Sequence, residues 1–224
     1  MAFLRKSRSI LELSPMICIV QEISMHDTLA INAPFSRWIG SSPHKGLAVI
    51  GFDEDVIALD NSCPPELPWA IPFTVGDFNI LAVWASVHAG NMRYVRVLHQ
   101  IIDRYAAFLR AKPSIVIGDF NSNTMWDGKR LSGGHAGIVD KLQLIGLKSL
   151  YHYQTGEPQG EESQPTFYLY RKPERPYHLD HAFVPETVLD RTRLTIGDPD
   201  IWLQLSDHMP LVVDIATETA TDRS

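Results

Sequence analysis

The chain has 224 residues, of which 45% are hydrophobic and 21% are charged, and its formal net charge is −6. These proportions are ordinary for a globular protein, and no apolar run reaches the length of about 18 residues that a membrane span needs. The negative charge argues against a protein that coats nucleic acid nonspecifically, because phosphate contacts need clustered lysine and arginine. It does not exclude an enzyme that holds one phosphodiester through a metal ion.

The cysteines indicate a reducing environment. Cys18 and Cys63 are the only two in the sequence. Cys18 lies in an apolar run, so we expect a small buried hydrophobic residue rather than half of a disulfide. The basic residues near the amino terminus are not followed by a long apolar run, so no secretory signal is apparent. We therefore expect a cytoplasmic protein.

In the amino-terminal half, the apolar pattern predicts one helix followed by short strands. The helix covers residues 1–13 and ends before Pro15. The strands are expected at residues 17–20, 46–52, 56–59, 71–74 and 79–87. The second and third of these are expected to pair as a β-hairpin, and residues 23–45 are expected to be mostly loop.

From residue 94 onward, the clearest element is a helix over residues 94–110 with one broad apolar face. A second helix is expected over residues 136–145, capped by Gly146. Further strands are expected at residues 114–117, 166–170, 178–184 and 211–215. No repeat or linker divides the chain, so we predict one α+β domain with packed sheets over residues 1–224, ending in a disordered tail over residues 216–224.

The stretch from Ser114 to Asn121 has the strongest functional pattern. Its first half is rich in β-branched residues and predicts a buried strand, after which Gly118 lets the backbone turn. Asp119 and Asn121 follow two residues apart, and in an extended segment such residues point to the same side. A carboxylate and a carboxamide are therefore expected together at the end of a core strand. A plain turn rich in aspartate and asparagine is the alternative interpretation.

Other polar residues also stand beside or within apolar, strand-like runs. In chain order the full set is Glu22, His88, Asp119, Asn121, Asp180, Asp207 and His208. Burying a carboxylate costs several kcal/mol unless it is paired or binds a cation. Several such groups therefore indicate a shared counter-charge, and a hard divalent cation such as Mg²⁺ suits carboxylate and amide oxygens. The isolated cysteines and the histidine spacing do not fit a structural zinc site.

Four motifs together resemble the endonuclease/exonuclease/phosphatase superfamily, which includes pancreatic-type deoxyribonuclease and the exonuclease III type of abasic-site endonuclease. They are Val20-Gln21-Glu22, Gly118-Asp119-Phe120-Asn121, Leu179-Asp180-His181 and Ser206-Asp207-His208-Met209-Pro210-Leu211. They occur in the family's order, and the match covers nearly the whole chain. The resemblance implies a four-layer αββα sandwich, in which two packed mixed β-sheets are flanked by helices.

The resemblance also implies catalytic roles for five residues. Asp119 matches the aspartate that orients or deprotonates the attacking water, and Asn121 matches the neighbouring asparagine that holds the phosphate. His208 matches the histidine at the scissile phosphate, and Asp180 matches the aspartate that pairs with it. His88 falls where the family places a histidine or tyrosine that meets the phosphate or the leaving group, so it is also a candidate substrate-binding residue.

The same resemblance implies a metal site. Glu22 matches the family's metal-binding glutamate, and Asp207 matches a second acidic residue near the metal. The expected cofactor is Mg²⁺, with Mn²⁺ as the alternative. Trp126 follows the central motif in a polar loop; an aromatic ring there could stack a base, and packing in the core or at the rim is the alternative.

One family feature is absent from the sequence. The family begins with a strand that ends in a Trp-Asn-like pair, and here Met1 opens the following helix directly. We therefore expect the first strand and one polar ligand to be missing. Either the start is an internal methionine of a longer protein, which we favour, or the chain is a truncated form.

The sequence therefore favours a divalent-metal-dependent phosphoesterase that hydrolyses a phosphodiester, nuclease-like, by direct attack of water. A phosphatase or diesterase acting on a lipid headgroup or a small phosphorylated molecule is the alternative. An inactive, truncated copy that serves as a binding module is the second alternative. The expected partner is a phosphodiester, with nucleic acid as the leading class, and no protein partner is evident. A Ser-His-Asp hydrolase is disfavoured because the sequence contains no nucleophile elbow.

Overall fold

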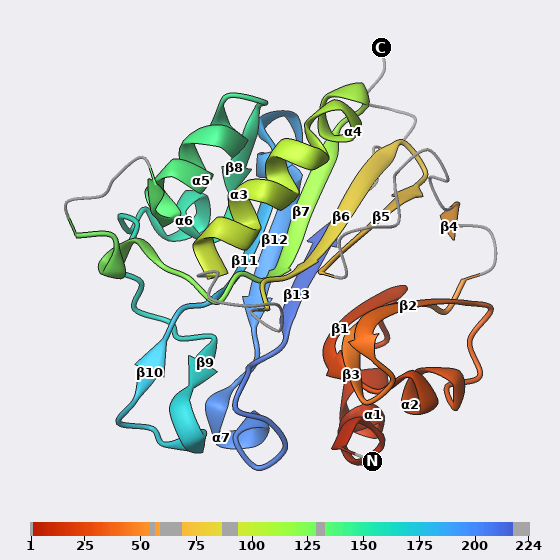
Figure 1. Cartoon of the computed structure of the whole chain (residues 1–224). Helices are drawn as coiled ribbons and strands as arrows, with labels where there is room; N and C mark the ends of the chain where they lie inside the picture. Colours follow the sequence, from red (N-terminus) through yellow and green to blue (C-terminus); the bar gives the residue numbers. More distant parts are fainter. Residues whose placement is uncertain (1, 54–56, 59–68, 87–93, 129–132, 217–224) are drawn as a thin grey trace.

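A mixed β-sheet runs through the middle of the molecule (Figure 1). The computed structural model describes residues 2–53, 57–58, 69–86, 94–128 and 133–216. In these residues the sheet has six strands in the order β4-β5-β6-β7-β11-β8. Their bounds are β4 Ile57–Ala58, β5 Ala70–Val75, β6 Phe78–Trp84, β7 Ser114–Asp119, β8 Leu147–Ser149 and β11 Asp180–Pro185.

One crossover connection joins the two parallel strands at the centre of this sheet. β6 and β7 are parallel, and the chain passes between them through α3 (Tyr94–Arg104) and α4 (Ala106–Ala111). Parallel neighbours need such a crossover, whereas antiparallel neighbours do not. The sequence predicts a single helix here, but the structure divides it at Tyr105, where the backbone departs from helical geometry. The buried face predicted for the helix is confirmed, with Val97, Leu98, Ile101 and Ile102 all buried.

A second layer of strands packs beside this sheet. It contains β1 (Ile17–Ile23), β2 (Phe35–Ser42) and β3 (Lys45–Gly51) in the order β1-β3-β2, and separately β12 (Thr192–Ile196) paired with β13 (Leu211–Ile215). Among the described strands, β1 pairs with β3 alone and β13 pairs with β12 alone. The expectation of an α+β sandwich of packed sheets is confirmed.

The predicted hairpin of residues 46–52 and 56–59 is wrong. β3 pairs with β1 and β2, while β4 pairs with β5. β2 is not predicted from the sequence, because its polar residues interrupt the alternation of apolar and polar residues that marks a strand. β2 pairs with β3 up to Ser42 opposite Lys45, so a tight turn of two residues joins them.

Helices cover the outer faces. Figure 1 shows α3 and α5 on one face of the central sheet and α1 beside β1 and β3. The remaining elements are α1 Ala2–Leu11, α2 Met25–Leu29, α5 His135–Gln143, α6 Leu150–Thr155, β9 Phe167–Tyr168, β10 Pro176–Tyr177 and α7 Pro199–Trp202. None of the helices in the described part of the chain is long and apolar enough to cross a membrane.

Several buried clusters join these layers. The largest includes Leu47 and Val49 of β3, Leu81 and Val83 of β6, and residues of α3 and α5. A smaller cluster joins β7 and β11 to the β12–β13 pair. Cys18 is buried with a free thiol, and burial raises its pKa to about 11, as expected of a small core residue.

Candidate active site

The end of β7 places Asp119 at the edge of the core. Gly118 precedes it with φ +144°, and a Cβ at that position would lie 1.9 Å from the carbonyl oxygen of Val83 on β6. Glycine is therefore required for β7 to lie this close to β6. Asp119 itself is buried although it is the last residue of the strand.

Strand register brings a second carboxylate beside the first. β7 and β11 are antiparallel, and Asp119 lies directly opposite Asp180. Residues directly opposite in such a pair point to the same face with their Cβ atoms about 5 Å apart. Like charges in this position destabilise the pair, so the two buried carboxylates need a counter-charge.

His208 supplies part of that charge. Its Nδ1 donates a hydrogen bond of 2.9 Å to Oδ2 of Asp180. Ligand atoms of Asp119, Asp180 and His208 all lie within 4.8 Å of one another. No other set of three or more acidic, histidine or cysteine side chains is found that close together among the described residues.

The protonation of this cluster follows from burial and from its own charges. Burial, followed by the charge of Asp180, raises the pKa of Asp119 to about 8. Burial alone would lower the pKa of His208, but the charge and hydrogen bond of Asp180, with the charges of Asp119 and Asp207, raise it to about 10. His208 is therefore an imidazolium at neutral pH.

Asn121 is held against Asp119, on the same side of the chain. Its backbone N–H donates to Oδ1 of Asp119 at 2.8 Å, and its side-chain amide donates to Oδ2 of Asp119 at 2.8 Å and to the carbonyl of Ala85 at 3.0 Å. Its φ of +48° is unusual for a residue other than glycine, and asparagine tolerates it best. Asn121 therefore fixes the orientation of the Asp119 carboxylate.

Glu22 and Asp207, the predicted metal ligands, lie around this cluster and not inside it. Glu22 sits at an irregularity of β1 with φ +61°, and Lys45 Nζ lies 2.6 Å from its Oε1. The same Lys45 ammonium lies 5.7 Å from the ring centre of Trp84. The charge of Glu22 still contributes to the raised pKa of Asp119, and the charge of Asp207 to that of His208. Both carboxylates are therefore within electrostatic reach of the cluster.

The two remaining predicted site residues, His88 and Trp126, are not part of this cluster. His88 lies outside the described residues. Trp126 is 51% exposed at the end of a 3₁₀ turn, Thr124–Trp126. Its ring lies 5.4 Å from that of Tyr177, which lies 6.4 Å from Phe167, and Phe167 lies 4.6 Å from His208. A series of aromatic rings thus leads from His208 out to the exposed Trp126.

The sequence analysis gave too little weight to the residues that support the cluster. Thr166 Oγ1 accepts hydrogen bonds from the backbone N–H groups of Leu179 and Asp180, both at 2.9 Å. Ser206 Oγ accepts from the backbone N–H of His208 at 3.2 Å and from Lys6 Nζ at 3.1 Å. Thr166 falls in a predicted strand and Ser206 opens one of the four motifs, but no sequence pattern links either residue to these contacts, and none links Lys6 to Ser206.

A group of buried histidines lies behind the cluster. The rings of His178 and His181 are 5.0 Å apart, and those of His181 and His135 are 4.6 Å apart. The strand expected over residues 178–184 begins later than predicted. β11 begins only at Asp180, so strand alternation does not apply to His178. Burial lowers the pKa of all three, that of His135 to about 4, so they are neutral at pH 7.

The fold matches several solved nuclease structures. A DNA-bound 3′ phosphatase, NExo from Neisseria, has a TM-score of 0.71 at 15% identity over 96% of this chain and 95% of that chain. An AP endonuclease from Archaeoglobus fulgidus has a TM-score of 0.68 at 18% identity over 96% and 95%. The endonuclease domain of TRAS1, a telomere-specific non-LTR retrotransposon, has 0.63 at 20% identity over 96% and 91%. No family model and no curated protein matches the sequence.

The chain therefore has the endonuclease/exonuclease/phosphatase fold that its motifs indicate. Among the matched structures, those of NExo and of the AP endonuclease are matched over almost their full length. The residues at the described site also suit a divalent ion. The two buried carboxylates of Asp119 and Asp180, side by side, offer oxygen ligands of the kind that Mg²⁺ and Mn²⁺ prefer.

Proposed function

We propose that the protein is a divalent-metal-dependent phosphodiesterase, that water attacks the phosphorus directly, and that nucleic acid is its substrate. The observation that carries this proposal is the buried cluster of Asp119, Asp180 and His208 at the ends of two core strands. Its support is the fold, which the chain shares with nucleases and a 3′ phosphatase.

Each residue has a role that follows from its contacts. With a pKa of about 8, Asp119 is largely protonated at neutral pH when no ion is bound, and a bound divalent ion would favour its charged form. The carboxylate, oriented by Asn121, then accepts the proton of the attacking water. Asp180 holds His208 as an imidazolium, whose remaining Nε2–H donates a hydrogen bond to the phosphate as negative charge develops on it. Glu22 and Asp207 would hold the divalent ion together with the carboxylates of the cluster, because the imidazolium of His208 has no lone pair to offer it. When bound, this ion neutralises the phosphate and stabilises the charge that develops in the transition state.

The segment between β9 and β10 supports nucleic acid as the substrate. It carries the exposed cations Arg171, Lys172 and Arg175, and the exposed ring of Tyr170. The strand before it, β9, begins at Phe167, whose ring contacts that of His208. The segment combines three exposed cations with one exposed aromatic ring. Cations bind phosphates and aromatic rings stack on unpaired bases.

A phosphomonoester substrate is the second candidate function. It is favoured by the net charge of −6 and by the fact that one matched structure is a 3′ phosphatase. A binding module without turnover would keep the same fold. A phosphodiesterase cuts a diester and a phosphatase cuts a monoester. Both turn over substrate, whereas a binding module does not.

The test is hydrolysis of bis(p-nitrophenyl) phosphate and of p-nitrophenyl phosphate by the purified chain with Mg²⁺ or Mn²⁺, and then with EDTA. We expect diester hydrolysis that needs the metal and that falls at least a hundredfold, as an estimate, in Asp119→Asn. Asp140→Asn, an exposed aspartate on α5, is the matched control and should retain the wild-type rate. Preference for the monoester would select the phosphatase, and no turnover of either would select the binding module.

A further inference from the structure

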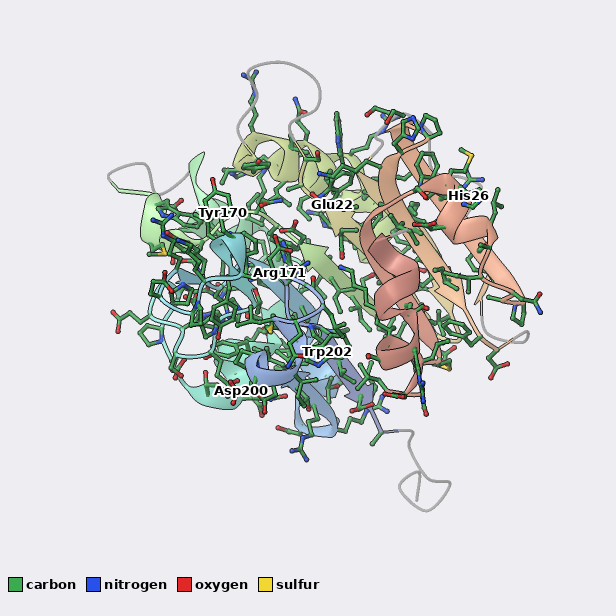
Figure 2. The ribbon with its side chains drawn as sticks, turned by 90° about the horizontal axis from the view of Figure 1, so that it is seen from below. Glu22, His26, Tyr170, Arg171, Asp200 and Trp202 are labelled. Carbon is green, nitrogen blue, oxygen red and sulfur yellow. The ribbon has the colours of Figure 1, made fainter. Side chains whose placement is uncertain are left out.

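The turn that carries Asp207 and His208 is held by two cations from distant parts of the chain. Arg171 donates to the carbonyls of Gln204 and Leu205, both at 3.3 Å. Lys6 of α1 donates to Oγ of Ser206 at 3.1 Å, across a sequence separation of 200 residues. Figure 2 shows Arg171 and Glu22 on the same face of the molecule. The Arg171 contacts hold only the backbone of the turn, whereas Lys6 reaches the side chain that supports His208.

Ser206 connects Lys6 to the candidate catalytic histidine. The buried Ser206 Oγ accepts one hydrogen bond from Lys6 Nζ and one from the backbone N–H of His208. A hydroxyl oxygen has two lone pairs, so both contacts can be made together. The position of the His208 backbone therefore depends on a group that α1 supplies.

Lys6 is also surrounded by the charges of the site. Burial lowers its pKa and the charge of Arg171 lowers it further, while the charges of Asp207 and Glu22 favour its protonated form. These two carboxylates are the predicted metal ligands. The ammonium group of Lys6 is thus a fixed positive charge within electrostatic reach of both.

The packing of α1 explains why this helix can reach the turn. Ile10 packs against the cluster of Cys18, Ile23 and Ile50, which belongs to β1 and β3. It also packs against the cluster of Tyr168, Trp202 and Met209, which belongs to the carboxyl-terminal segment. α1 therefore joins the strands β1 and β3 to the segment that carries the Ser206–His208 turn. Lys6 lies one helical turn before Ile10, so the two side chains lie on the same face of α1.

We propose that Lys6 is a positioning residue of the active site, which holds the Ser206–His208 turn through Ser206 and places its ammonium group at the residue that precedes Asp207. It takes no part in bond making. Its effects on rate and on metal affinity rest on the proposed function, whereas its effect on stability does not.

The first test is a double-mutant cycle of Lys6→Met and Ser206→Ala on the kcat for bis(p-nitrophenyl) phosphate. Loss of a residue that supports a catalytic group lowers activity about tenfold to a hundredfold. Because both residues act through one hydrogen bond, the double variant should be no slower than the slower single variant. Lys6→Arg should restore most of the rate. Arg8→Met, on the same helix and exposed, is the matched control and should keep the wild-type kcat.

The second test measures the Mn²⁺ affinity of the same variants by calorimetry. Removing a positive charge near the carboxylates should tighten Mn²⁺ binding in Lys6→Met, by an estimated three- to tenfold. Lys6→Arg and Arg8→Met should bind Mn²⁺ as the wild type does. A purely structural role would weaken binding or leave it unchanged.

The inference is wrong if the two kcat losses multiply in the double variant, or if Lys6→Met binds Mn²⁺ no more tightly than the wild type. If the wild type hydrolyses no phosphoester, the proposed function fails but the inference is still decided. The same double-mutant cycle is then measured on the free energy of unfolding. Coupling between Lys6→Met and Ser206→Ala supports the inference, and strict additivity of their effects overturns it.

Discussion

At the scale of single residues, the charge of Asp180 is what keeps His208 protonated. The charge and hydrogen bond of Asp180 overcome the effect of burial on the His208 pKa. In Asp180→Asn we therefore expect that pKa to fall from about 10 toward neutrality, which an NMR titration of the imidazole measures. The variant should also lose about a hundredfold or more in kcat. An unchanged His208 titration would show that another group holds the proton.

Gly118 makes a second prediction at this scale, about stability. In Gly118→Ala the new Cβ would meet the Val83 carbonyl, and the φ of +144° is strained for any side chain. We expect a loss of roughly 3 kcal/mol or more in the free energy of unfolding, measured with urea. Gly133→Ala is the control, because a Cβ there meets nothing within 4 Å. Equal losses in both variants would contradict this account.

Some residue-level features of the site could be predicted from the sequence, and others could not. The two-residue spacing of Asp119 and Asn121 correctly indicated that their side chains lie together. It could not indicate that the Asn121 amide binds Asp119 itself, because this depends on a φ of +48°. Nor could it find Lys6, whose partner Ser206 comes close only through packing of the whole chain.

At the scale of elements, α5 and the start of β11 bury histidines that must stay neutral. Burial lowers the pKa of His135 from 6.5 to about 4 in the folded state. Its contribution to stability is therefore fully present above pH 6.5 and is lost as the pH falls from there toward 4. By this linkage His135 alone should remove roughly 2 kcal/mol between pH 7 and pH 5.

Urea unfolding of His135→Phe at the two pH values measures this contribution. The variant should lose less stability than the wild type on going from pH 7 to pH 5. His26→Gln, whose side chain is 90% exposed in the wild type, is the control and should follow the wild type. Parallel losses in His135→Phe and the wild type would mean that other groups cause the acid sensitivity.

Elements with a plain apolar pattern were predicted well, and those shaped by pairing were not. The helix predicted over residues 136–145 and the strand predicted over residues 114–117 agree with the structure to within two residues at each end. β2 was missed because its alternation is masked by polar residues, and β4 was given the wrong partner. Strand partners depend on contacts distant in sequence, which a local pattern does not contain.

At the scale of the whole molecule, the net charge of −6 must be reconciled with an anionic substrate. The cations of the β9–β10 segment offer a local answer. If they bind nucleic acid, log KM for an oligonucleotide should rise with log salt concentration, and Lys172→Ala should lower that slope by about 0.7 to 0.9. Lys112→Ala, after α4 at the other end of the sheet, should leave the slope unchanged. If the dependence of log KM on log salt concentration has the same slope in the wild type, Lys172→Ala and Lys112→Ala, the result would argue for a small substrate.

The overall architecture followed from the order of four motifs, more than from any one of them. The motifs indicated the sandwich, and the fold shared with NExo and the AP endonuclease confirms it. The motifs did not indicate that Glu22 would pair with Lys45. The predicted absence of a first strand stays a prediction.

The central claim is that the Asp119–Asp180–His208 cluster hydrolyses phosphodiesters with a divalent ion. The most direct measurement is cleavage of an end-labelled oligonucleotide with Mg²⁺, comparing the wild type with Asp119→Asn and with the wild type in EDTA. The account predicts cleavage by the wild type alone. Equal cleavage in Asp119→Asn, or cleavage that persists in EDTA, would contradict it.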